Sequence, residues 1–436
     1  MSVTTSNQQP DESLSPEYRL TRRELLPLVG VAAVVAALGP ASLASAQGAE
    51  RPSGKKPGAQ ARFVYVGTYT APNTAPGGTH PSTALGISVF TLDPHTGGLT
   101  LLQIVENIPN PSWVTLDPQN RVLYASSEVS TWKGVNNSGG LTAYSVDPTT
   151  GKLTVLNDQP TLGAIPAHVT VDPSGKYALV ANYIGANFTV LPIQPNGSLS
   201  PATDVFAVTG TGPNPQRQEA PHPHQIQFDP AAKFVFGNDL GTDRVWTWIL
   251  DYAAGKLVPN GPQFVPPPPP YAQVAGGSGP RHTAFHPSGK FAYVIDEMVS
   301  SITAFSYDAT HGTMIWRQTV STLPHKFTGI SSCAEIVMHP SGKFVYGSNR
   351  GHNSIVGFAI DQNTGMLTVI EWTSTRGGIP RSFNIDPSGA LLLAGNQDSG
   401  TIVPFSINPN SGKLKATGHV TNTPTPVCIQ FGLTVP

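Results

Sequence analysis

Short segments of alternating apolar and polar residues recur along the chain, separated by polar turns. Runs such as 343–347 and 354–360 are rich in β-branched and aromatic residues, and beyond the N-terminal segment no long stretch has apolar residues at helical spacing. One turn, of the form D-P-x-T-G-x-L, recurs seven times at intervals of 47 to 57 residues, beginning at Asp93, Asp147, Gln194, Asp251, Asp308, Asp361 and Asn408. Periods of this size are typical of solenoids and propellers. Each repeat is therefore expected to form one four-stranded sheet.

A second turn recurs out of phase with the first, but only six times, beginning at Asp117, Asp172, Asp229, His286, His339 and Asp386. An Asp or His followed by Pro suits a type I turn. The second turn thus occurs once less often than the first. This indicates that the chain enters at the second strand of a sheet, 63–67, and that the C-terminal run 427–431 supplies the missing innermost strand. Such closure leaves no sheet edge exposed. The pattern thus predicts an all-β, seven-bladed β-propeller, with four antiparallel strands per blade and the ring closed by the C-terminal strand.

Composition supports one large all-β domain. The chain has 44 Gly and 43 Pro in 436 residues, and only 12% of its residues are charged, which suits many short strands joined by tight turns. The formal net charge is −1, so neither nucleic acid nor an acidic membrane surface is an expected partner. We expect a monomer that acts on a small molecule.

The N-terminal 46 residues have the pattern of an export signal. Arg22 and Arg23 precede an apolar run that ends at Leu38, and Ala44-Ser45-Ala46 offers a small-residue cleavage site. The paired arginines resemble a twin-arginine signal. The apolar run is shorter than the roughly 20 residues of a membrane span, so no stable membrane insertion is expected after cleavage. We therefore divide the chain into a twin-arginine-type signal (1–46), a flexible segment (47–62) and the propeller (63–436), and expect a periplasmic or secreted protein.

The chain has two cysteines, Cys333 and Cys428. An oxidising compartment permits a disulfide between them. Aligned on the repeat, however, they lie in the inner strands of blades six and one, with blade seven between them. A disulfide requires Cα atoms within roughly 7 Å, so we expect two buried free thiols.

Polar and charged residues gather at one face of the predicted propeller. The start of each inner strand and the end of each second strand meet at the same face, because neighbouring strands are antiparallel. Equivalent positions at the inner-strand starts hold His168, His224, Arg281, His282, Glu335 and Arg381. The second-strand ends contribute Glu128, Asn182, Asp239, Glu297, Arg350 and Gln397.

The residues at this face have two interpretations, as structural caps or as a functional site. Single Asn or Asp residues there are typical caps of sheet ends. Two arginines, a carboxylate and an imidazole in one concavity instead indicate a functional site, because burying them needs a reason. His222 and His224 with His168 and His282 raise the possibility of zinc, but no H-E-x-x-H motif or Cys pair at ligand spacing is present, so neither metal nor another cofactor is expected. The absence of a G-x-S-x-G motif argues against a serine hydrolase.

The same residues resemble a known family over essentially the whole propeller. The matching stretches are 221–225 (PHPHQ), 239–244 (DLGTDR), 279–282 (GPRH), 296–298 (DEM), 348–352 (SNRGH) and 396–399 (NQDS). They are similar to the seven-bladed propeller lactonases, the family of bacterial 6-phosphogluconolactonase and fungal 3-carboxy-cis,cis-muconate cyclase. The resemblance implies a propeller with an active site at the channel mouth.

In that family a His, two Arg and a Glu have been proposed as the active site, which by motif correspond to His224 (or His222), Arg281, Glu297 and Arg350. Lactone opening needs a base for water, cationic donors for the oxyanion and an acid for the ring oxygen. We assign Glu297 as base, Arg281 and Arg350 as clamps and His224 as acid, with the Glu and His roles interchangeable. Substrate-binding roles are predicted for His168, His222, Asp239, His282, Glu335, Arg381 and Gln397.

Three functions remain open at this point. They are a hydrolase of sugar-type lactones, a lactone-forming muconate cyclase and a non-catalytic ligand-binding propeller. Because 6-phosphogluconolactone is a cytosolic metabolite and this chain carries an export-like segment, an unphosphorylated sugar lactone is the preferred substrate.

Overall fold

The computed structural model describes residues 61–70, 82–261 and 270–433. These residues contain strands and turns, and none of the described segments forms a helix that could cross a membrane. The expected signal at 1–46 and most of the 47–62 segment lie outside the described residues. Strand β1 begins at Ala61, two residues before the expected start of the propeller.

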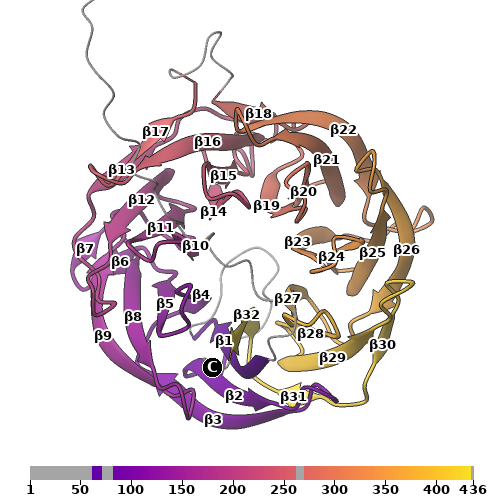
Figure 1. Ribbon diagram of the computed structural model, residues 1–436, viewed down its shortest axis with the longest axis horizontal. Coiled ribbons are helices and arrows are strands. Elements are labelled where there is room, and N and C mark those ends of the chain that lie inside the picture. The colour runs from indigo at the N-terminus through magenta and orange to yellow at the C-terminus, as the bar shows by residue number, and fades with distance from the viewer. Residues whose placement is uncertain (1–60, 71–81, 262–269, 434–436) are drawn as a thin grey trace, which may run out of the picture. The chain divides into compact units, whose positions relative to one another are not determined.

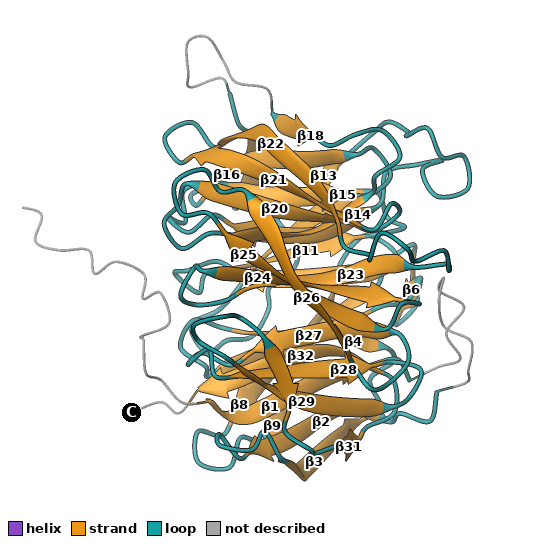
Figure 2. Cartoon of the chain, turned by 90° about the vertical axis from the view of Figure 1, so that its right-hand side faces the viewer, coloured by secondary structure: helices purple, strands orange, loops and turns teal. Residues whose placement is uncertain are grey.

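Seven four-stranded antiparallel sheets, the blades, surround a central axis, as predicted (Figures 1 and 2). The innermost strands of blades 1 to 7 are, in order, β32 (Pro426–Leu433), β4 (Pro111–Leu116), β10 (Pro166–Val171), β14 (Pro223–Phe228), β19 (Pro280–Phe285), β23 (Ser332–Met338) and β27 (Pro380–Ile385). The second strands are β1 (Ala61–Thr68), β5 (Val122–Ser127), β11 (Tyr177–Asn182), β15 (Val235–Asp239), β20 (Phe291–Asp296), β24 (Phe344–Arg350) and β28 (Leu391–Asn396).

Two further rings of strands complete the blades. The third strands are β2 (Gly86–Leu92), β8 (Gly140–Val146), β12 (Asn187–Pro192), β16 (Arg244–Asp251), β21 (Ser301–Asp308), β25 (Ser354–Ile360) and β29 (Thr401–Ile407). The outer strands are β3 (Leu99–Glu106), β9 (Leu153–Pro160), β13 (Asp204–Ala207), β17 (Lys256–Pro259), β22 (Thr313–Ser321), β26 (Leu367–Ser374) and β30 (Leu414–Ala416). Short strands β18 (Tyr271–Gln273) and β31 (Thr421–Asn422) extend blades 4 and 7, and β6 (Thr131–Trp132) pairs with β7 (Val135–Asn136).

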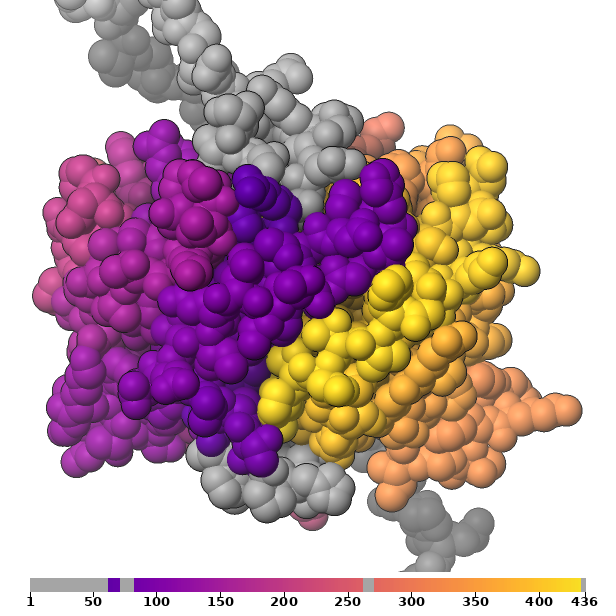
Figure 3. Space-filling model, turned by 90° about the horizontal axis from the view of Figure 1, so that it is seen from below, coloured from indigo at the N-terminus to yellow at the C-terminus, as the bar shows by residue number. Residues whose placement is uncertain are grey.

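The ring is closed by the chain ends, which confirms the predicted closure. Strand β32 pairs antiparallel with β1, so that Val64 is opposite Phe431 and Val66 opposite Ile429. Figure 3 shows the outer surface where the ring closes, with N-terminal residues in indigo and purple beside C-terminal residues in yellow. Blade 1 therefore consists of the first three strands and the last strand of the domain.

The hydrophobic core lies between the blades. Seven clusters of buried apolar residues are present in the described chain, and each contains side chains from two neighbouring blades. The cluster where the ring closes joins Val64 and Phe90 of blade 1 to Leu393 and Ile402 of blade 7. Because every blade packs against a neighbour on both faces, the second strands are buried at almost every position. The blades therefore depend on one another for burial of their apolar surface.

The D-P-x-T-G turns also join neighbouring blades. The Asp side chain accepts the N–H groups two and three residues later, as Asp147 does from Thr149 and Thr150. The turn glycine has positive φ, 69° at Gly151, which favours a residue without Cβ. Its carbonyl accepts a hydrogen bond from a buried tyrosine of the preceding blade, and the pairs are Tyr65–Gly151, Tyr124–Gly197, Tyr293–Gly365 and Tyr346–Gly412.

Both cysteines are free and buried, as expected. Cys333 lies in β23 and Cys428 in β32. Burial raises the pKa of both thiols to about 12, so neither is a thiolate at neutral pH.

Truncation after Thr425 should unfold or aggregate the protein. The truncation removes β32, and with it Cys428, Ile429 and Phe431, from clusters on both faces of blade 1. Single large-to-small core substitutions already cost about 2–5 kcal/mol. Thermal unfolding followed by circular dichroism tests this, with Val420→Ser, at an exposed position of the same terminal segment, as control. A truncated protein that melts with the full-length one would show that closure is dispensable.

Candidate active site

Inner-strand β-bulges position the side chains at one end of the channel. Six of the seven inner strands begin with proline, and the pairing with the second strand skips the next residue. In blade 4, Pro223 pairs with Asp239 and Gln225 with Asn238, which leaves His224 unpaired. Arg281 and Arg381 are the corresponding residues of blades 5 and 7. Since bulges redirect side chains and are common beside active sites, this explains why the aligned repeat positions carry the unusual residues.

Glu297 lies at the centre of an arginine cluster at this end, the channel mouth. It follows β20 directly, and its Oε2 lies 2.9 Å from Nη2 of Arg350 and 3.1 Å from Nε of Arg281. Arg217, from the loop between β13 and β14, places its Nη2 2.7 Å from Oε1. The first three side chains are buried, and Arg217 is 29% exposed. The structure thus brings three of the four predicted catalytic residues into direct contact.

The cluster fixes the charge of Glu297. Burial acts to raise its pKa, but Arg350, Arg281 and Arg217 together hold it well below its usual range. Burial, with Arg381 and Arg350 nearby, lowers the pKa of Arg281 to about 10, which still leaves it charged at neutral pH. Glu297 is therefore an ionised counter-charge that orients three guanidinium groups, and so low a proton affinity makes it a poor general base.

Two buried N–H groups of the cluster lack an acceptor among the described residues, namely Nε of Arg281 and Nε of Arg350. Nε of Arg281 is near Glu297, but its N–H does not point at the carboxylate. Each guanidinium also donates to a backbone carbonyl, Arg281 Nη1 to that of Ala334 and Arg350 Nη2 to that of Cys333. Buried donors without acceptors favour the binding of an anionic group.

Arg381 forms a second charged contact at the mouth. Its guanidinium lies 5.4 Å from the ring centroid of Tyr69, whose hydroxyl donates to Glu128. Gln397, also predicted to bind substrate, is buried beside Asp398, and its Oε1 has no donor among the described residues. Both residues lie at the mouth end of blade 7, and their roles in substrate binding stay predictions.

Beside the arginine cluster, three buried side chains form a hydrogen-bonded chain. Nδ1 of His282 lies 2.8 Å from Oε1 of Glu335, and its Nε2 lies 3.2 Å from Nδ1 of His224. His168 packs edge-on against His282 and lies against Trp113. Burial and the charge of Arg281 lower the pKa of His224 and of His282, so both are neutral at pH 7. His224 is thus linked to the arginine cluster through its neighbour rather than by direct contact.

His222 and Asp239 are engaged in local structure. His222 stacks on Tyr183, and its ring nitrogens contact the Tyr183 carbonyl and Glu219. Asp239 is fully buried and accepts hydrogen bonds from His222 N, Gly241 N and Thr242 Oγ1. Their contribution to substrate binding stays a prediction, and the contacts indicate a role in shaping the loop after β15.

Sequence reasoning missed Arg217 and Tyr69. Arg217 lies in the long inter-blade loop between β13 and β14, outside the turns and strand ends on which the repeats align, so the alignment gives no signal for it. Tyr69 follows β1 at the position that Glu297 occupies after β20, and extending the alignment to blade 1 would have found it. Within the described ranges, no group of three or more His, Cys, Asp or Glu side chains is arranged to hold a metal ion.

Comparisons with known proteins agree with this architecture. The family model described as "Lactonase, 7-bladed beta-propeller" matches residues 63–431. The 6-phosphogluconolactonase of Bacillus subtilis (strain 168) is 36% identical over 367 residues, which cover 84% of this chain and 97% of the relative.

Solved structures give the same result. A putative 6-phosphogluconolactonase from Bacteroides fragilis superposes with a TM-score of 0.75 at 31% identity, covering 87% of this chain and 99% of the other. The Pseudomonas aeruginosa periplasmic gluconolactonase PpgL has a TM-score of 0.75 at 28% identity, covering 86% and 99%. The chain therefore belongs to the family of seven-bladed β-propeller lactonases.

Proposed function

We propose that the protein is an exported lactonase that hydrolyses an unphosphorylated sugar-type lactone by general acid–base catalysis at the channel mouth. The observation that carries the proposal is the arginine cluster around Glu297. Two buried N–H groups of this cluster have no acceptor among the described residues, and the cluster lies beside a neutral histidine. The relative from Pseudomonas aeruginosa, named a periplasmic gluconolactonase, supports this substrate class. The phosphorylated sugar lactone of the Bacillus relative's name is the main alternative substrate.

In this proposal His224 is the general base and Glu297 is not. Nε2 of His224 takes a proton from water, and the resulting hydroxide bonds to the lactone carbonyl carbon. Arg281 and Arg350 donate to the oxygen on which negative charge develops. Collapse of this intermediate breaks the bond to the ring oxygen, which receives the proton back from His224. The product carboxylate then faces guanidinium groups whose planar geometry suits it.

The arginine cluster also suits other anionic substrates, so the assay must separate the candidate functions. Mature protein is given gluconolactone, its 6-phosphate and carboxymuconate, with proton release followed over time. Opening of gluconolactone supports the proposal. Conversion of carboxymuconate alone would support a lactone-forming cyclase, and inactivity on all three would support a ligand-binding propeller.

His224→Gln and Arg281→Ala should each lower kcat/KM for lactone hydrolysis by about a hundredfold or more. Loss of a general base typically costs about 10²–10⁴ in rate, and loss of an oxyanion donor about 10²–10³. His95→Gln, in an exposed turn at the opposite face, is the matched control and should retain full activity. Full activity of both site variants would refute the assigned roles.

Glu297→Gln should lower both activity and thermal stability. It leaves three mutually repelling guanidinium groups without their carboxylate, and removing one partner of a buried ion pair costs about 3–5 kcal/mol. Because Arg217 is partly exposed, we expect the lower end of this range. Inorganic phosphate should restore part of the lost melting temperature by supplying an anion, whereas Glu106→Gln, at an exposed strand end, should change neither property. An unaltered melting temperature would contradict the structural role of Glu297.

Export is tested by replacing Arg22 and Arg23 with lysine. If the N-terminal segment directs twin-arginine export, the double variant should accumulate in the cytoplasm with its first 46 residues attached, while the parent is recovered outside it. Cell fractionation and N-terminal sequencing give both readouts. Unchanged export of the double variant would exclude this route.

A further inference from the structure

The hydrogen-bonded chain of Glu335, His282 and His224 joins three consecutive blades. The three side chains come from the inner strands β23, β19 and β14, and at most 6% of each residue is exposed. The contacts measure 2.8 Å between Glu335 and His282 and 3.2 Å between His282 and His224. Of these three side chains the proposed hydrolysis uses only His224, and no chemical step of it involves Glu335 or His282, for which the sequence predicts substrate binding.

Two proton arrangements satisfy this chain. A neutral imidazole has one N–H and one lone pair, so fixing one nitrogen fixes the other. When Glu335 is ionised, it accepts a hydrogen bond from Nδ1–H of His282. Nε2 of His282 then accepts from Nδ1–H of His224, which leaves a lone pair on Nε2 of His224. When Glu335 is protonated, both donations reverse and Nε2 of His224 carries the proton. In the described part of the chain Nε2 of His224 has no hydrogen-bond partner, so this end is available to substrate or water.

We propose that Glu335 and His282 are positioning residues that relay the proton taken up by His224, with the Glu335 carboxylate as its acceptor during lactone opening. The inference rests on the proposed lactonase function. Three transfers balance the step. Water gives a proton to Nε2 of His224, Nδ1–H of His224 passes to Nε2 of His282, and Nδ1–H of His282 passes to Oε1 of Glu335. The same transfers in reverse protonate the departing ring oxygen.

Electrostatics explain why a relay is needed. A proton that stayed on His224 would form a buried imidazolium next to cations, which burial and the charges of Arg281 and Arg381 disfavour. The relay neutralises a carboxylate and leaves both imidazoles uncharged. Burial raises the pKa of Glu335 to about 8, partly offset by Arg281, so its proton affinity near neutral pH suits an acceptor. The titratable and charged groups around the chain are His168, Tyr183, Arg281, Glu297, Arg350, Arg381 and Cys428.

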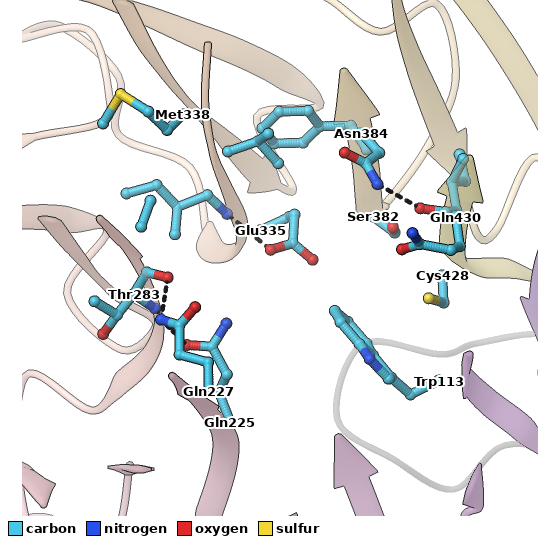
Figure 4. Close-up of a pocket in the computed structure, with 15 residues that line it drawn as sticks. Trp113, Gln225, Gln227, Thr283, Glu335, Met338, Ser382, Asn384, Cys428 and Gln430 are labelled. Atoms are coloured by element: carbon cyan, nitrogen blue, oxygen red, sulfur yellow. Dashed lines mark hydrogen bonds between the residues drawn. The ribbon is translucent and has the colours of Figure 1, made fainter. Parts of the chain in front are cut away.

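Glu335 also borders a cavity of about 250 Å³ within the channel. Figure 4 shows its carboxyl group pointing into this cavity, with Trp113, Ser382 and Gln225 around it. Other lining residues, such as Gln227 and Gln430, lie further along the inner strands and so further from the mouth. Glu335 is therefore placed between the site and a polar cavity, in which water can exchange protons with it.

The protonation state of Glu335 determines how kcat depends on pH. Below about pH 8 Glu335 is mostly protonated and His224 presents N–H, whereas above it Glu335 is ionised and His224 presents the lone pair required of a base. Enzymatic kcat, corrected for spontaneous hydrolysis, should therefore rise through about pH 8. Glu335→Gln should lower the alkaline plateau of kcat about tenfold to a hundredfold, leave KM nearly unchanged and abolish this rise.

Matched variants separate a relay from a structural role. Asp296→Asn removes another buried carboxylate with a raised pKa, about 7, which is bonded to Ser301 and Thr303 and not to the histidines. It should retain the rise. Glu335→Asp keeps a titratable carboxylate and should keep a rise in kcat at a reduced rate. Loss of the rise in Asp296→Asn, or its persistence in folded Glu335→Gln, would overturn the proposal.

A spectroscopic measurement tests the relay without turnover. Isotope-labelled ring nitrogens of His224 and His282 report which nitrogen is protonated. In the parent, both rings should change tautomer as the pH passes through the titration midpoint of Glu335. Glu335→Gln should hold both rings in one tautomer, and Asp296→Asn should behave as the parent does. A parent with no tautomer exchange refutes the relay. A parent that shows the exchange but opens no lactone refutes the lactonase proposal and, with it, the catalytic use of this chain, while confirming the proton linkage itself.

Discussion

Pairing of β1 with β32 is the constraint on which the other features depend. It closes a ring in which each hydrophobic cluster lies between two blades, so that no blade buries its apolar surface alone. Closure also brings the starts of seven inner strands around one axis. The site uses residues from several blades, and its geometry exists only while the ring is intact.

Much of this architecture is predictable from the sequence because a repeat carries its own register. The two turn types predict the blades, and their unequal number predicts the closure. Alignment on the turns also identifies Arg281, Glu297 and Arg350, which the structure places in contact, and Glu335 and His282, because bulges occupy the same place in each inner strand. The repeat pattern contains no information about loops unique to one blade, and so it missed Arg217. It also does not determine how side chains of neighbouring blades pair, so it gives no sign that three guanidinium groups surround Glu297.

Charge in the channel is arranged in two layers. At the mouth, arginines outnumber carboxylates, and the excess positive charge favours the binding of an anion. In the layer beside it, neutral imidazoles and a carboxyl group with a raised pKa replace fixed charges. This division explains how a buried site accommodates both binding and proton movement, since the cations that favour an anionic ligand would otherwise oppose a cationic histidine.

The hydrogen bond from a tyrosine to the turn glycine of the next blade bears on how such a ring arises. The bond occurs at four of the seven junctions, and blades 2 and 6 each contain both a tyrosine that bonds to the following blade and a turn glycine that accepts from the preceding one. A gene segment that encodes one such repeat therefore encodes both the tyrosine donor and the glycine acceptor of this hydrogen bond. Tandem duplication of that segment lengthens the chain by a unit that already fits its neighbours, and new interfaces need not evolve before the extra blade is stable.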